Sequence, residues 1–255
     1  AMIVKSIRSA LNELRLDSIN LKDELSILMR LPFDEDVEQE EQEYREATVY
    51  KLLADYRKAN HLHFSISQGF NQFEIHVQVP AGAPQLDTIR TLLLILKKEL
   101  NFPFRIGAGV SPSYERSRYF AEHALMEADR YGRNDAFFMD EEDKITGPLS
   151  ADNQLMYNYS NEKALAFARE NGINETNILK LISIFEQDEE QLISSHALSE
   201  KLGITMRSAS RILAKLYDLD MIRFRDTAPD TKTPRQGRPS HYYHFNSEAF
   251  REALL

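Results

Sequence analysis

The stretch Ser194–Arg225 reads SSHALSEKLGITMRSASRILAKLYDLDMIRFR, and its pattern predicts two short helices joined by a tight turn. A serine precedes the first helix, Gly203 permits the turn, and Thr205 stands where a residue would cap the second helix. Four apolar residues of that second helix fall at positions i, i+3, i+4 and i+7, namely Ala209, Ile212, Leu213 and Leu216. This spacing puts them on one face of a helix, so we expect that face to be buried.

The other side of the same helix is basic. Arg207, Arg211 and Lys215 recur every four residues, away from the apolar stripe, and Ser208 lies beside them. A helix that buries one face and presents a basic, hydrogen-bonding face is what a DNA recognition helix requires. Affinity for phosphate depends on such positive charge, so this face predicts contact with nucleic acid.

A hairpin with a basic loop is expected after this helix. Residues 221–225 and 241–245 are strand-like, and the segment 226–240 between them is rich in Pro, Thr, Lys and Arg. Arginines on such a slim loop suit the narrow minor groove, where the potential is strongly negative. The residues that we expect to contact DNA are Thr205, Arg207, Ser208, Ser210, Arg211, Lys215, Lys232, Arg235 and Arg238.

The order of these pieces resembles the winged helix-turn-helix of bacterial transcription regulators. HALSEKLGIT (196–205) is similar to its second helix, SRILAKLYDLDMIRF (210–224) to its recognition helix and first wing strand, and GRPSHYYHF (237–245) to its second wing strand. The resemblance covers the last quarter of the chain and implies binding to double-stranded DNA. It also implies a homodimer, because one such module contacts only a half-site.

The residues ahead of this module predict a mixed α/β domain. Period-two alternation on both sides of Gly69-Phe70-Asn71 predicts a β-hairpin over residues 61–79. Helices are expected at 9–30, 36–59, 86–100, 117–131 and 161–170, and further strands at 2–7, 104–110 and 136–139. Pro148 to Asp152 is typical of a boundary. We therefore expect a domain of residues 1–149, a connector of 150–173 and a DNA-binding domain of 174–255.

The segment IGAGVSPSYERSRYFAEHALMEADRYGRNDAFFMDEE (106–142) resembles the C-terminal part of GGDEF-type nucleotide cyclase domains, in which ADRALYEAKRxGRN lies between two strands. The turn GFNQF (69–73) sits where that family keeps its signature. The match is carried by Ala121, Ala124, Leu125, Ala128, Gly132, Arg133 and Asn134. The resemblance implies a cyclase-palm-like (ferredoxin-like) α/β sandwich. The fold class that we expect for the chain is α+β, with this sandwich followed by the winged helix-turn-helix.

The carboxylates that such a cyclase needs to hold Mg²⁺ against a triphosphate are missing. Asn71 and Gln72 replace the acidic pair of the signature, and the expected first strand, residues 2–7, has no Asp or Glu. We therefore expect no enzymatic activity, catalytic residue, metal or cofactor, and a domain that senses a small-molecule effector or pairs subunits. The alternative is a nucleotide-handling enzyme with a protein-binding winged helix, for which Glu74 is the nearby candidate ligand.

Composition and charge limit the remaining classes of function. The 255 residues have a net charge of -9 at pH 7 and no cysteine, which excludes disulfides, zinc fingers and thiol catalysis. Acidic residues gather between positions 34 and 46, whereas basic residues gather between positions 207 and 238, and this asymmetry favours nucleic acid at one end. No apolar run approaches the ~18 residues that span a membrane. The absence of disulfides fits a reducing cytoplasm, where we expect the protein.

Overall fold

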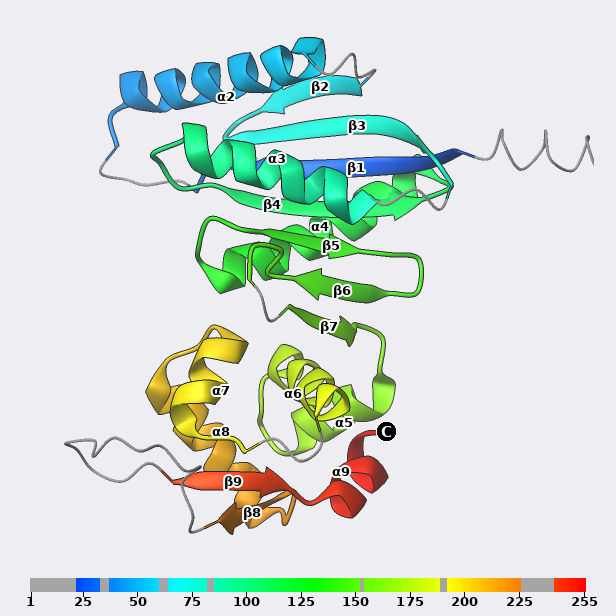
Figure 1. Cartoon of the computed structure of the whole chain (residues 1–255), viewed down its shortest axis with the longest axis vertical. Coiled ribbons are helices and arrows are strands. Elements are labelled where there is room, and N and C mark those ends of the chain that lie inside the picture. The colour runs from blue at the N-terminus through cyan, green and yellow to red at the C-terminus, as the bar shows by residue number, and fades with distance from the viewer. Residues whose placement is uncertain are drawn as a thin grey trace, which may run out of the picture. The chain divides into compact units, whose positions relative to one another are not determined.

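The computed structural model of the chain describes residues 22–32, 37–59, 64–81, 85–151, 154–188, 192–225 and 241–255. The chain divides into an N-terminal unit, Ala1–Glu141 with Gly147–Ala151, and a C-terminal unit, Glu142–Thr146 with Asp152–Leu255. Both units combine helices with strands, so the protein belongs to the α+β class (Figure 1). Among the described residues, no helix has the length and apolar character needed to cross a membrane.

The N-terminal unit is built on a sheet with the strand order β2-β3-β1-β4-β5 (Figure 1). β1 is antiparallel to both β3 and β4, and β4 is parallel to β5. The strands are β1 (Lys22–Arg30), β2 (Phe64–Gly69), β3 (Gln72–Pro80), β4 (Arg105–Ser111) and β5 (Ala136–Met139). The helices are α2 (Gln39–Ala59), α3 (Gln85–Glu99) and α4 (Tyr114–Tyr131). The main core joins α2 and α3 to one face of the sheet.

Helix α4 lies directly on β4 because two glycines leave room for it. A Cβ atom on Gly107 would lie 2.1 Å from the backbone nitrogen of Leu125, and one on Gly109 would lie 2.4 Å from the backbone oxygen of Ser117. Any larger residue at either position would collide with the backbone of the helix. The buried hydroxyls of Ser26 and Ser117 hydrogen-bond at 2.8 Å and tie α4 to β1 in the same region.

The first described strand corrects the sequence prediction. The helix expected over residues 9–30 is wrong from residue 22 onward, because residues 22–30 form β1. Five successive residues of β1, Leu25 to Met29, are buried, since the helices of the unit cover both faces of the strand. Of these five residues only Ser26 is polar, so the run does not alternate, and its periodicity is as compatible with a helix as with a strand. The strand expected at residues 2–7 lies outside the described residues.

The other predicted elements of this unit are confirmed within a few residues. The hairpin forms from β2 and β3, with its turn at Phe70 and Asn71, and Asn71 takes a positive φ of 54°. Positive φ is tolerated by asparagine better than by most residues. Helix α4 begins three residues before the expected start and ends at Gly132, whose φ of 73° closes the helix.

The C-terminal unit contains most of β6 (Lys144–Gly147) and all of β7 (Leu155–Asn158), two neighbouring strands that the sequence did not predict. Five helices and a hairpin of this unit follow in the described residues: α5 (Glu162–Glu170), α6 (Glu175–Gln187), α7 (Ser195–Leu202), α8 (Met206–Asp218), β8 (Ile222–Arg225), β9 (Tyr242–Phe245) and α9 (Ser247–Leu254). Helix α5, which falls in the segment expected as a connector, packs against α6 and α9. The rings of Phe185, Phe245 and Phe250 meet at centroid distances of 4.7–5.2 Å and join α6, β9 and α9.

Candidate nucleic-acid interface

The helix pair α7–α8 begins and turns where the sequence predicts. The side chain of Ser194 accepts a hydrogen bond from the backbone of Ala197, and that of Thr205 accepts one from Ser208, each at 3.2 Å. These two hydrogen bonds satisfy amide groups that the first turn of a helix leaves unpaired. Gly203 ends α7 in the left-handed conformation with a φ of 69°. The expected caps and turn are therefore confirmed.

The apolar stripe of α8 is buried as expected. Its members are each at most 8% exposed: Ala209, Ile212, Leu213 and Leu216. The helix is therefore fixed in rotation, and the residues on its other side must face solvent.

Arg207 and Arg211 lie on this solvent-facing side and are exposed. Within the described part of the chain, neither guanidinium has a hydrogen-bond or ion-pair partner. Lys215 differs, because its ammonium group donates to the backbone carbonyls of Asn171 at 2.9 Å and Gly172 at 2.7 Å. The three expected cations thus divide into two with free donors and one that holds the turn between α5 and α6.

The remaining polar residues expected on this helix bond within the helix pair. The hydroxyl of Ser210 donates to that of Ser195 at 3.0 Å and links α8 to α7. The hydroxyls of Thr205 and Ser208 lie 3.0 Å apart at the start of α8. The hydrogen bond between Ser210 and Ser195 holds α7 and α8 together. Arg207 and Arg211 remain as the exposed basic groups in the first turns of α8.

Both strands of the expected hairpin are present. β8 and β9 are antiparallel, and Arg225 lies opposite Tyr242 in the register. Ile193, just before α7, adds a third strand position, since its amide and carbonyl exchange hydrogen bonds of 2.8 and 2.9 Å with Tyr243. The loop that joins the strands carries Lys232, Arg235 and Arg238, which lie outside the described residues.

In the N-terminal unit, an ion pair lies beside the turn GFNQF (69–73), where the resemblance places the acidic signature of a cyclase. β1 ends at Arg30, opposite Gln72 in the register. The guanidinium of Arg30 pairs with Asp129 of α4 and donates to the side-chain oxygen of Gln72 at 3.3 Å. β1 does carry two acids, Asp23 and Glu24, but they lie at its other end, opposite Val79 and Gln78. The expectation of a strand without acids concerned residues 2–7, which lie outside the described residues, and in β1 neither acid is near the turn.

Both carboxylate oxygens of Glu74 are engaged. The hydroxyl of Tyr114 donates to one at 2.5 Å, and Arg118 donates to the other at 3.3 Å. The hydrogen bond to Glu74 raises the pKa of the Tyr114 hydroxyl, because it stabilises the protonated phenol. Among the described residues, no group of three or more His, Asp or Glu side chains is placed to hold a metal ion.

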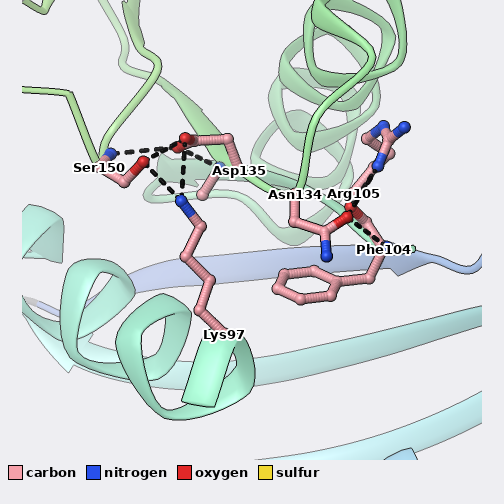
Figure 2. A network of polar contacts seen from close by, with 7 residues as sticks. Lys97, Phe104, Arg105, Asn134, Asp135 and Ser150 are labelled. Carbon is pink, nitrogen blue, oxygen red and sulfur yellow. Dashed lines mark hydrogen bonds and ion pairs between the residues drawn. The ribbon is translucent and has the colours of Figure 1, made fainter. Parts of the chain in front are cut away.

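Asn134, the last residue of the GRN sequence that carries the cyclase resemblance, makes structural hydrogen bonds to the start of β4 (Figure 2). The side-chain oxygen of Asn134 accepts from the backbone of Phe104 at 3.0 Å and from Arg105 at 3.2 Å. Arg105 also donates to the carbonyl of Gly132 at 2.7 Å. Burial lowers the pKa of Arg105, and nearby Asp129 opposes this effect. These hydrogen bonds join the start of β4 to the turn that follows α4.

Asp135 forms a second network that the sequence did not reveal (Figure 2). This carboxylate is 3% exposed, and one of its oxygens accepts from the backbone amides of Ala136 at 2.9 Å and Ser150 at 3.1 Å. Its other oxygen bonds the Ser150 hydroxyl and the ammonium group of Lys97, the latter at 3.4 Å. Lys97 also donates to that hydroxyl at 2.6 Å. The sequence showed only that an acidic residue stands directly before a strand. It could not show this network, because Ser150 and Lys97 are distant from Asp135 along the chain.

Comparison with known proteins gives no functional assignment, so a proposal of function depends on the geometry described above. No protein-family model and no curated protein matches the chain. The exposed arginines of α8, on a helix whose rotation and entry angle are fixed by its neighbours, are the feature on which a functional assignment rests.

Proposed function

We propose that the protein is a transcription regulator whose C-terminal unit is a winged helix-turn-helix that binds double-stranded DNA. The observation that carries the proposal is the pair of exposed side chains Arg207 and Arg211, which have no partner within the described residues. Such an arginine can donate to a phosphate or to a guanine edge without first breaking an ion pair. Two of them one helical turn apart match the spacing that a recognition helix presents to a groove.

The packing around α8 supports this assignment. Gly203 and the two caps set the turn between the helices, and Lys215 fixes the far end of α8 to the turn after α5. In the proposed complex, α8 enters the major groove with its first turns, and Lys215 acts by holding the helix in place. The loop between β8 and β9, with Lys232, Arg235 and Arg238, then contacts the neighbouring backbone or minor groove.

For the N-terminal unit, we propose a degenerate relative of the cyclase domain that senses a small molecule or pairs two copies of the chain. The pairing of Arg30 with Asp129 supports this, because it puts a guanidinium beside the turn where a cyclase holds Mg²⁺ with carboxylates. Glu74, the nearby candidate for the alternative enzymatic function, has both oxygens bonded to its own protein. No interaction of the described residues favours that alternative.

The test is a titration of the purified full chain against a fluorescently labelled duplex of mixed sequence, followed by anisotropy at increasing salt. We expect binding at low salt that weakens as salt rises, because neutralising phosphates releases counterions. Arg207→Ala combined with Arg211→Ala should weaken binding and lower the salt slope by about 0.9 for each phosphate that the double variant leaves without a cation. Lys163→Ala is the matched control, since Lys163 is an exposed cation on α5. A double variant that binds like the control would contradict the proposed interface.

A further inference from the structure

The core of the N-terminal unit opens into a cavity of about 330 Å³ that is lined by residues of α2, α3 and the sheet. The sheet contributes Ile27, Ile75 and Val77 to its wall, and the helices contribute Leu53 and Leu92. This volume lies at the lower end of the range of ~300–1,000 Å³ for small-molecule sites. The cavity is therefore large enough for a small organic molecule.

Such a space is unusual inside a hydrophobic core. Well-packed interiors contain few voids larger than a water molecule, and an empty apolar cavity destabilises a protein in proportion to its volume. Around the cavity, Tyr56, Phe64, Val77 and Val79 pack against the core but remain only partly buried. The cavity is partly open to solvent, since the exposed residues Gln78, Pro80 and Thr88 also line it, and its largely apolar wall favours an apolar molecule.

The chemistry of the wall defines the class of ligand. No charged side chain is among the described residues that line the cavity. A carboxylate or phosphate entering it would lose its hydration without gaining a counter-charge, which disfavours a charged ligand. The polar residues that line the cavity are Tyr56, Gln78 and Thr88. Burial raises the pKa of Tyr56, so its hydroxyl is protonated and uncharged like the rest of the wall.

We propose that this cavity binds an uncharged, largely apolar small molecule of the size of a bicyclic aromatic, with one polar group directed to the exposed side of the wall at Thr88. Within β3 the cavity is lined by Ile75 and by residues 77–80, whereas the turn that carries the cyclase resemblance lies at the start of the strand. The proposed site is therefore distinct from the place where that resemblance would put a nucleotide. That its ligand regulates DNA binding rests on the proposed function, but that the cavity binds the ligand does not.

The test is equilibrium dialysis of the full chain against 1-naphthol, with the matched anion 1-naphthoate as a second probe. We expect saturable binding of one 1-naphthol per chain, and binding of 1-naphthoate weaker by about tenfold or more, because its carboxylate must be desolvated. The chain has no tryptophan, so a tryptophan can be introduced as a bulky plug and a single reporter of folding. Val77→Trp and Thr88→Trp place it in the cavity wall, and Leu94→Trp places it on the exposed side of α3, where Leu94 is 64% exposed.

Both plugs should weaken 1-naphthol binding by about tenfold or more, and the Leu94→Trp control should bind like the parent chain. Thr88 is exposed, so its variant still tests the proposal if Val77→Trp fails to fold. Absence of saturable binding to the parent, equal binding by Thr88→Trp, or tighter binding of the anion would each overturn the proposal. A separate titration of duplex DNA with and without 1-naphthol tests regulation. If the chain binds no DNA, the proposed function fails while the dialysis result stands.

Discussion

At the scale of single residues, Arg211 is the side chain from which we expect sequence specificity. It stands one turn into α8, exposed, with no partner within the described residues. If its guanidinium reads a guanine edge, Arg211→Ala should weaken binding to the genuine operator by ~1–3 kcal/mol and relax the preference at one base pair. The measurement is a set of dissociation constants on the operator and on duplexes mutated one position at a time. An unchanged preference at every position would show that Arg211 contacts only the backbone.

Gly107 is a residue at which packing leaves no room for a side chain. We expect Gly107→Ala to destabilise the N-terminal unit by ~1–3 kcal/mol, because its Cβ would lie 2.1 Å from the backbone of Leu125 and α4 would have to move. Gly69→Ala is the matched control, since its Cβ would meet nothing closer than 4.0 Å. The midpoint of urea unfolding, followed by circular dichroism, compares the two. Equal midpoints would mean that α4 shifts at little cost.

Residue patterns predicted the two faces of α8 but not the hydrogen bonds of Lys215. The spacing of Arg207, Arg211 and Lys215 placed all three on one face, and the structure agrees that they are exposed. Yet the ammonium group of Lys215 binds the carbonyls of Asn171 and Gly172, which precede it by more than 40 residues. Backbone carbonyls are the same in every residue, so the sequence carries no signal for such a partner.

At the scale of elements, prediction succeeded where a cap or a turn marks each end. The ends of α7 and α8 follow from a serine, a glycine and a threonine, and the β2–β3 hairpin follows from alternation around a turn. β1 offered no such mark. Its buried residues, Leu25 to Met29, are apolar except for Ser26 and do not alternate, and only tertiary covering by helices on both faces makes the segment a strand. β7 and α9 have only four and eight residues and were missed, whereas α7, which is as short as α9, was predicted because a serine and a glycine mark its ends.

The arrangement of β1, the hairpin turn and α4 leads to a prediction about catalysis. Arg30 lies beside Gln72 and pairs with Asp129, so a guanidinium stands near the place where Mg²⁺ would need carboxylates. Incubation of the chain with GTP or ATP and Mg²⁺ should therefore give no cyclic product by chromatography. Turnover that depends on Mg²⁺ and disappears in Glu74→Gln would contradict this and favour the enzymatic alternative.

At the scale of the whole molecule, the chain passes from one unit to the other more than once. The sequence indicated a boundary at Pro148 to Asp152, and the chain does leave the N-terminal unit after residue 151. However, residues 142–146 belong to the C-terminal unit and residues 147–151 return to the N-terminal unit. The network of Asp135 with Ser150 and Lys97 holds this returning segment (Figure 2). Such a return depends on interactions between residues distant in sequence, which local patterns do not encode.

The number of chains on each DNA site is the prediction that belongs to this scale. One α8 presents two exposed arginines, Arg207 and Arg211, and in the proposed complex it would read only a few base pairs, so the proposed regulator would need two copies on a two-fold site. We expect two chains on a duplex with half-sites ~10–10.5 base pairs apart, and a much weaker complex with one half-site, by roughly 10²-fold or more, because pairing makes the second binding event intramolecular. Mass photometry and anisotropy measure the stoichiometry and the affinity.

A change in spacing is the control for this prediction. Moving the half-sites by ~5 base pairs turns them to opposite faces of the duplex, since one helical turn is ~10.5 base pairs. Two chains held together in a fixed geometry cannot then reach both, so the affinity should fall to that of the single half-site. If instead one chain binds per duplex, with the same affinity at either spacing, the C-terminal unit acts as a monomer. Of the two roles proposed for the N-terminal unit, only the sensing of a small molecule would then remain, because pairing of two chains would be ruled out.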